Sequence, residues 1–345
     1  MSDDRAIRDA VDQLLVPGEN RYTLAELSRL AEFDPREVRR FWRAMGFPDP
    51  PDDDAIFTDT DVAVLASLDR YLKEDMVDRE VALQITRVVG QAMSRVAEAE
   101  VAAVRERLEA SEATRTDEEV GAALVARSAE LLPAIEDLLV YQWRRHLAAA
   151  AQRAVMARRS EAGAFLTVGF ADLVGFTALS QQLEERELAE VVGRFETVAY
   201  DTVASHGGRI VKMIGDAVMF VTAEPAAGAE IGLTVAEVYG ADETVSDVRV
   251  GLAHGTVLGL EGDYFGPTVN LASRIVNIAY AGAVVVSPEI HERLAGDEHF
   301  VLRPVRARRL KGIGTVPLWT VRRPDQASPR LPEAVRERMR ARREH

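Results

Sequence analysis

The sequence predicts an α+β protein in which an all-α N-terminal domain precedes a domain of mixed strands and helices. The chain has 345 residues, which exceeds the usual size of one domain. Residues 1 to about 159 show almost only helical patterns, whereas short β-type runs separated by helical segments begin near Phe165. We therefore expect a helical domain at 1–143, a helical linker at 144–163, a mixed domain at 164–323 and a basic, disordered tail at 324–345.

The N-terminal half carries a succession of helix signals. Thr23 and Glu26 have the spacing of a capping box, and Asp34 followed by Pro35 places an N-cap before a first-turn proline. Gly46 is expected to end that helix. Further helices are expected to begin near Thr60 and to span roughly 78–107 and 117–159, with an alanine-rich end that forms the linker.

In the second half, short segments rich in residues that favour β structure are expected to form strands. Their boundaries are set by turn residues and by intervening helical patterns. The expected strands are Phe165–Phe170, Arg209–Ile214, Val218–Val221, Val248–His254, Thr256–Leu260, Ala283–Val286 and Val316–Val321.

Composition limits the class of protein. No apolar run reaches the ~20 residues that cross a bilayer, and the acidic N-terminus lacks a secretory signal, so we expect a cytoplasmic protein without a transmembrane segment. The absence of cysteine excludes disulfides and thiolate chemistry, and leaves oxygen or imidazole as metal ligands. A net charge of −14 argues against a broad nucleic-acid-binding surface.

Two aspartates stand where strands end. Asp172 directly follows the first expected strand, and Asp216 occupies a tight turn between the second and the third. Carboxylates so placed suit a pair of Mg²⁺ ions, which prefer oxygen ligands and accept phosphate oxygens in the remaining positions. Either aspartate taken alone is better explained as a turn or capping residue.

Three separated motifs extend this pattern: Phe-Ala-Asp-Leu-Val-Gly-Phe-Thr at 170–177, Lys-Met-Ile-Gly-Asp at 212–216 and Gly-Asp-Tyr-Phe-Gly-Pro-Thr-Val-Asn-Leu-Ala-Ser-Arg at 262–274. With them the segment from Phe165 to Val321 resembles the class III nucleotidyl cyclases. The resemblance implies a ferredoxin-like βαββαβ catalytic domain that converts ATP to 3′,5′-cyclic AMP and pyrophosphate. It also implies two metal ions per site, Mg²⁺ or Mn²⁺, held by Asp172 and Asp216.

The same resemblance assigns the other site residues. Lys212 and Asp263 match the pair that reads the base, and an ammonium donor with a carboxylate acceptor complements adenine. Guanine reverses these roles, so Lys212 with Asp263 favours ATP, and a guanylate cyclase is the alternative enzyme. Asn270 and Arg274, four residues apart on one helix face, match the pair that positions the ribose and stabilises the transition state. Lys311 matches a phosphate-binding lysine, and Phe176 and Thr177 are expected to contact substrate.

In this family, opposite partners supply the metal ligands and the asparagine–arginine pair to each site. One chain here fills all six positions: Asp172, Lys212, Asp216, Asp263, Asn270 and Arg274. The resemblance therefore implies a homodimer with two equivalent sites. A catalytically inactive binding module would be expected to lack at least one of these residues.

Residues 20–70 resemble the helix-turn-helix of MerR-type regulators, with arginines 36, 39, 40 and 43 along the expected recognition helix. A DNA-binding regulator is thus a second hypothesis, which the acidic turn at 52–54 disfavours. The whole layout resembles soluble actinobacterial cyclases with a helical regulatory domain. That resemblance implies autoinhibition responsive to pH, with His146 as a candidate switch, or to a fatty acid or lipid bound among apolar residues at 77–104 and 124–139.

Overall fold

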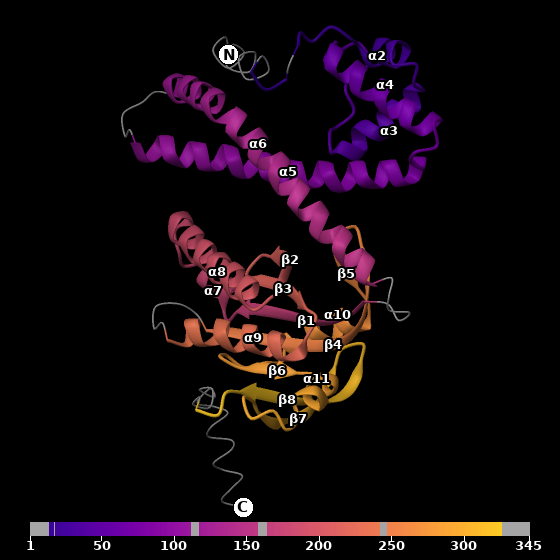
Figure 1. Cartoon of the computed structure of the whole chain (residues 1–345). Helices are drawn as coiled ribbons and strands as arrows, with labels where there is room; N and C mark the ends of the chain where they lie inside the picture. The colour runs from indigo at the N-terminus through magenta and orange to yellow at the C-terminus, as the bar shows by residue number, and fades with distance from the viewer. Residues whose placement is uncertain (1–13, 17, 112–116, 158–163, 242–246, 326–345) are drawn as a thin grey trace, which may run out of the picture. The chain divides into compact units, whose positions relative to one another are not determined.

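The computed structural model describes residues 14–16, 18–111, 117–157, 164–241 and 247–325 (Figure 1). The chain divides into two compact units, Met1–Gln152 and Arg153–His345, and each is described by itself. The expected disordered tail lies outside the described residues except for its first two positions, and so does the end of the expected linker, at 158–163. No helix in the described ranges has the length and apolar character needed to span a membrane.

The N-terminal unit is helical, as expected. Its helices are α2 (Leu24–Leu30), α3 (Pro35–Met45), α4 (Asp59–Lys73), α5 (Arg79–Ser111) and α6 (Asp117–Ala157). Thr23 and Glu26 form the predicted capping box, and Asp34 accepts a hydrogen bond from the Arg36 amide at the start of α3. Gly46 ends α3 in the left-handed conformation with φ of 100°. The cap signals therefore predicted these helix ends correctly.

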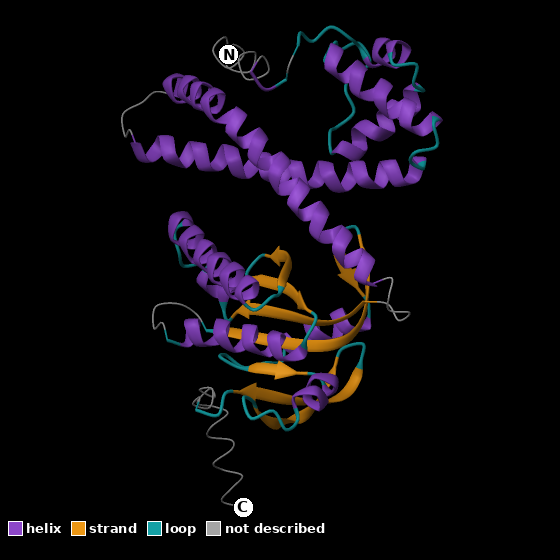
Figure 2. Cartoon of the chain, viewed as in Figure 1, coloured by secondary structure: helices purple, strands orange, loops and turns teal. Residues whose placement is uncertain are grey.

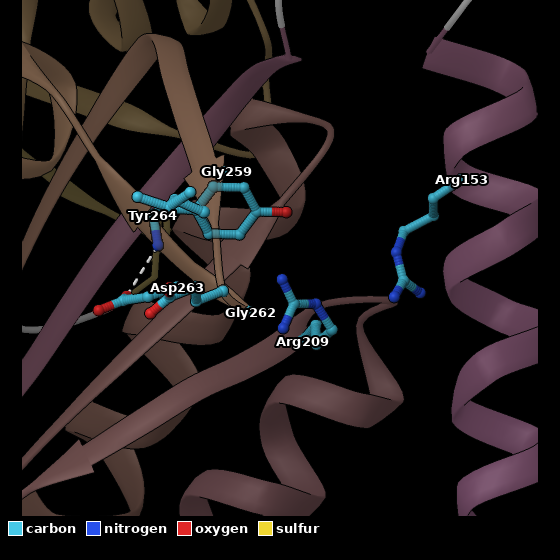
Figure 3. Close-up of a pocket in the computed structure, with 8 residues that line it drawn as sticks. Arg153, Arg209, Gly259, Gly262, Asp263 and Tyr264 are labelled. Carbon is cyan, nitrogen blue, oxygen red and sulfur yellow. Dashed lines mark hydrogen bonds between the residues drawn. The ribbon is translucent and has the colours of Figure 1, made fainter. Parts of the chain in front are cut away.

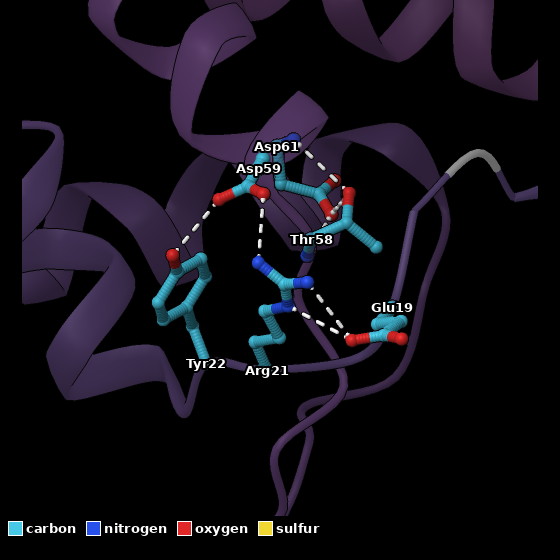
Figure 4. Close-up of polar contacts among 6 residues, drawn as sticks. All are labelled: Glu19, Arg21, Tyr22, Thr58, Asp59 and Asp61. Carbon is cyan, nitrogen blue, oxygen red and sulfur yellow. Dashed lines mark hydrogen bonds and ion pairs between the residues drawn. The ribbon is translucent and has the colours of Figure 1, made fainter.

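A short backbone bridge joins the segment before α2 to the segment before α4. Tyr22 and Phe57 form an isolated antiparallel bridge, and the Phe57 side chain is buried in the core of this unit. The Tyr22 hydroxyl donates a hydrogen bond of 2.8 Å to Asp59, and Arg21 contacts both Glu19 and Asp59 (Figure 4). These contacts fix the N-terminus of α4 against the first strand-like segment.

Helix α5 packs closely on α3. A Cβ atom added at Gly90 would lie 2.3 Å from the carbonyl oxygen of Met45, so only glycine permits this approach. Two ion pairs join the same helices near the start of α5, from Arg40 to Glu80 at 2.8 Å and from Arg79 to Glu37 at 2.9 Å. Close packing and two ion pairs therefore hold the helix-turn-helix segment against the first half of α5.

The second unit is built on one mixed sheet (Figure 2). The strand order is β2-β3-β1-β4-β6-β8-β7, with β5 paired to β4. The strands are β1 (Ala164–Leu173), β2 (Arg209–Ile214), β3 (Ala217–Thr222), β4 (Val248–Leu260), β5 (Asp263–Phe265), β6 (Val284–Val286), β7 (Val301–Leu310) and β8 (Gly314–Arg322). The helices are α7 (Phe176–Leu179), α8 (Glu185–Ser205), α9 (Pro225–Gly240), α10 (Pro267–Val276) and α11 (Pro288–Leu294).

The first part of this unit has the expected ferredoxin-like arrangement. The chain runs β1-α8-β2-β3-α9-β4, and these four strands lie in the order β2-β3-β1-β4 with antiparallel neighbours. Residues of α8, α9 and α11 share one buried cluster with the sheet, and residues of α10 share a second cluster on its other face. The result is a sheet with a hydrophobic core on each side.

The structure differs from the strand predictions at three strands, β4, β5 and β7. The expected break at Gly255 is wrong, because β4 continues through it and Gly255 pairs with Leu166 of β1. A Cβ at Gly255 would lie 2.7 Å from Thr268 Oγ1, so this glycine admits α10 rather than ending a strand. Strand β7 was not predicted, since it is rich in arginine and contains Pro304, a residue that sheets tolerate on edge strands.

Candidate active site

The two aspartates predicted to hold metal ions lie next to each other at one end of the sheet. Asp172 is near the end of β1, and Asp216 occupies the two-residue turn between β2 and β3, where Gly215 takes a φ of 61°. The Leu173 amide donates a hydrogen bond of 3.1 Å to the Asp216 carbonyl, and Asp172 is opposite Ala217 in the β1–β3 ladder. Sheet pairing thus brings together two carboxylates that are 44 residues apart in the sequence.

Asp172 also pairs with Arg249, which the sequence analysis did not identify. The two residues are opposite each other in the β1–β4 ladder, and Arg249 Nε lies 2.7 Å from Asp172 Oδ2. Their side chains are 28% and 14% exposed, so the ion pair is partly shielded from water. The sequence signal was a single arginine between two buried valines, and only the strand register shows what it faces.

Burial raises the pKa of Asp216, and the nearby charge of Asp172 raises it further. A hydrogen bond from the Asp216 backbone amide and the cation of Arg249 act in the opposite direction. Among the described residues, no three histidine, aspartate or glutamate side chains are grouped so that they could hold a metal ion. Two adjacent carboxylates fit Mg²⁺ or Mn²⁺, which commonly complete their coordination with substrate phosphates and water.

The two residues expected to read the base are already in contact. The Lys212 ammonium, from β2, donates a hydrogen bond to Asp263 Oδ2, and the Tyr264 amide donates a hydrogen bond of 2.7 Å to Asp263 Oδ1. Both Lys212 and Asp263 side chains are partly exposed, at 38% and 25%. Figure 3 shows Asp263 and Tyr264 beside Gly259 and Arg209. The pair therefore places a hydrogen-bond donor and an acceptor side by side.

The remaining predicted residues lie on other elements. Asn270 and Arg274 are exposed on α10, four residues apart and so on one face of that helix. Lys311 is exposed in the turn between β7 and β8, and Thr177 is exposed on α7. Phe176 instead packs against a buried core cluster, which gives it a structural explanation.

Three of the four arginines of the helix-turn-helix pair with carboxylates, whereas Arg36 is exposed on α3. Arg39 pairs with Asp52, Arg40 with Glu80, and Arg43 Nε lies 2.8 Å from Asp49 Oδ1. These guanidinium groups would have to give up a carboxylate partner before they could neutralise DNA phosphates. This arrangement favours a packing role for the helix-turn-helix over the DNA-binding hypothesis.

Comparison with known proteins finds matches for both units. A family model described as the adenylate and guanylate cyclase catalytic domain matches residues 159–323, and one described as the adenylate cyclase regulatory domain matches residues 10–147. The solved structure of the adenylyl cyclase CyaB from P. aeruginosa is 25% identical, with 47% of this chain and 97% of that chain covered and a TM-score of 0.41.

Relatives align over nearly the whole chain. An adenylate cyclase of Streptomyces coelicolor is 38% identical, over 91% of this chain and 89% of that protein. One of Glutamicibacter nicotianae is 34% identical, over 90% and 82%. A Mycobacterium tuberculosis protein named pH-sensitive adenylate cyclase is 35% identical, over 90% and 80%. This chain therefore belongs to the class III adenylate and guanylate cyclase family, and it joins that catalytic domain to an adenylate cyclase regulatory domain.

Proposed function

We propose that this protein converts ATP to 3′,5′-cyclic AMP and pyrophosphate. The observation that carries this proposal is the pairing of Lys212 with Asp263 on the unit that also brings Asp172 and Asp216 together. Adenine presents a ring nitrogen that accepts a hydrogen bond and an amino group that donates one. Lys212 donates to the former and Asp263 accepts from the latter, whereas guanine would face a donor with a donor.

The reaction is an in-line attack of the ribose 3′-hydroxyl on the α-phosphorus, so it needs placement and charge stabilisation. Asp172 and Asp216 would hold two divalent ions, Mg²⁺ or Mn²⁺, which activate the hydroxyl and neutralise phosphate charge. Asn270 orients the ribose, and Arg274 stabilises the charge that grows on the α-phosphate. Lys311 binds the departing pyrophosphate portion.

Each site is completed by a second copy of the chain. Asn270 and Arg274 are exposed, whereas the two aspartates are only partly exposed near the end of β1. Large apolar side chains are also exposed on the β4–β5 hairpin, with Leu258 62%, Leu260 48% and Phe265 47% exposed. Such a surface suits burial against another protein surface, which supports a homodimer with two shared sites.

The helical domain expected at 1–143 serves as an inhibitory regulator of the catalytic domain expected at 164–323. The match to a regulatory domain and the name of the pH-sensitive relative support regulation by this unit. Exposed apolar residues on α5, among them Ile85, Val89 and Met93, offer a surface for a lipid ligand or a second copy.

Product analysis tests the proposed reaction. Purified full-length protein is incubated separately with ATP and with GTP in the presence of Mg²⁺ or Mn²⁺, and cyclic nucleotides are quantified by chromatography. We expect cyclic AMP from ATP and much slower formation of cyclic GMP. Cyclic GMP as the main product would instead establish the guanylate cyclase alternative, and no cyclic nucleotide with either ion would refute the proposal.

A further inference from the structure

The base-reading pair joins two strands that share no backbone pairing. Lys212 belongs to β2, whereas Asp263 begins β5, and β5 is hydrogen-bonded only to β4 in the part of the chain that the structure describes. The distance between the ammonium and the carboxylate is therefore not set by a β-ladder. Side-chain contacts between β2 and β5 must set it.

A β-bulge in β2 allows a second side-chain contact between β2 and β5. Arg209 is opposite Val221 and Lys212 is opposite Met219, with the register shift between Ile210 and Lys212. Opposed residues of an antiparallel ladder point to the same face, and residues two apart on β3 also share a face. Arg209 and Lys212 therefore lie on one face although they are three positions apart, which a regular strand forbids.

Arg209 uses this placement to contact the residue next to Asp263. Its guanidinium carbon lies 5.3 Å from the centre of the Tyr264 ring, within the range of a cation–π interaction. The ring also lies against Gly259, its partner in the β4–β5 ladder, as Figure 3 shows. Tyr264 is thus held by β4 through Gly259 and by β2 through Arg209.

Tyr264 is also hydrogen-bonded to the base-reading carboxylate of Asp263. Its backbone amide donates to Asp263 Oδ1, while Lys212 donates to Oδ2. The two parallel contacts between β2 and β5, Arg209 with Tyr264 and Lys212 with Asp263, therefore fix the carboxylate in position and in orientation.

We propose that Arg209 and Tyr264 form a positioning pair that sets the preference of the site for adenine over guanine. This inference rests on the proposed function. When β5 is held against β2, the donor and the acceptor keep the fixed order that adenine requires. When it is released, the carboxylate and the ammonium can rearrange, which penalises ATP more than GTP.

The test compares kcat/KM for ATP and for GTP in Arg209→Met, Tyr264→Leu and the double variant. We expect each single variant to lower the ATP-to-GTP ratio by about tenfold or less, the size of one cation–π contact, mainly through a higher KM for ATP. The double variant should lower the ratio no further than either single variant. Tyr264→Phe keeps the ring and should retain the wild-type ratio.

Arg186→Met, which removes a 91% exposed arginine on α8, controls for the loss of positive charge. Thermal unfolding of each variant controls for folding. An unchanged ratio in both single variants, or equal losses for ATP and GTP, would overturn the inference. If the wild-type protein forms no cyclic nucleotide, the proposed function fails, but the inference can still be tested. The ratio of binding affinities for α,β-methylene ATP and its GTP counterpart then replaces the kcat/KM ratio.

Discussion

The proposed metal-binding role of Asp172 and Asp216 depends on where the sheet places them as well as on their carboxylate chemistry. Each replacement by asparagine keeps the size of the side chain and removes one negative charge from the metal ligands. We expect either variant to lower kcat by at least about a thousandfold, because bound metal contributes several kcal/mol to transition-state stabilisation. Cyclic AMP formation at saturating Mn²⁺ measures this, with far-UV circular dichroism as the folding control. Near wild-type turnover by either variant would contradict the two-metal assignment.

We expect His254 to make the stability of the catalytic unit depend on pH. It is buried on β4, its Nδ1 lies 2.9 Å from Thr167 Oγ1, and burial lowers its pKa from 6.5, with Arg293 adding to the effect and Glu224 and Glu289 opposing it. Because the unfolded chain then binds a proton more readily than the folded one, stability should fall as pH drops below about 6.5.

Hydrogen exchange of the β1 amides between pH 5 and 7.5 measures this, after correction for the intrinsic pH dependence of exchange. Protection should decrease toward pH 5 in the wild-type protein and decrease less in His254→Gln, which keeps a polar side chain without a titrating ring. Equal pH dependence in the two proteins would assign the effect to other groups.

Sequence patterns singled out candidate site residues in compact motifs, but missed Arg249, whose contact depends on strand register. Asp172, Lys212, Asp216 and Asp263 stand in recognisable motifs, and the structure brings them together in two pairs. Arg249 stands alone in its strand, and its contact with Asp172 follows only from the β1–β4 pairing. No local signal reports such a long-range register.

At the scale of elements, the crossing of α3 and α5 depends on Gly90. We expect Gly90→Ala to destabilise the helical unit by about 1 to 3 kcal/mol, because the new methyl group would overlap the Met45 carbonyl. Gly193→Ala is the matched control, since this glycine lies in α8 and an added Cβ would have no heavy atom within 4 Å beyond the nearby backbone of its own helix. That substitution should stabilise its helix by up to about 1 kcal/mol.

Urea denaturation followed by circular dichroism gives both changes in the free energy of unfolding. A Gly90→Ala protein as stable as wild type would show that the helices separate at this crossing without cost. A destabilised Gly193→Ala protein would show that the control position is more constrained than its surroundings indicate.

Local chemistry determined which elements could be predicted. Helix ends were predicted where a cap residue marks them, as at Thr23, Asp34 and Gly46. Strand β4 was wrongly divided at Gly255, because the close approach of Thr268 that requires glycine comes from a helix further along the chain. Strands β5 and β7 lack a long alternating pattern, so their pairing partners define them.

At the scale of the whole molecule, the helical unit is expected to restrain the catalytic one. Helix α6 ends at Ala157, and β1, which carries Asp172, begins at Ala164. A shift of that acid by ~1 Å relative to its partner residues would cost on the order of a hundredfold in rate. We therefore predict higher specific activity for a fragment that begins near Arg159 than for the full-length protein.

Both proteins are assayed for cyclic AMP between pH 6 and 8, after light scattering establishes that each is dimeric. A difference that changes with pH would support a titrating group, with His146 as the first candidate for replacement. Equal specific activities across this range would leave the helical unit as a passive dimerisation module.

The measurement that tests the shared-site account most directly is complementation between two inactive variants. Asp172→Ala removes a metal ligand, and Arg274→Ala removes an exposed side chain of α10. In a mixed dimer one site carries both lesions and the other carries neither. We predict that each variant alone is inactive and that mixing them under conditions of proven subunit exchange restores up to about a quarter of wild-type activity, because half the dimers are mixed and each has one intact site. A mixture that remains inactive while subunits exchange would contradict the account.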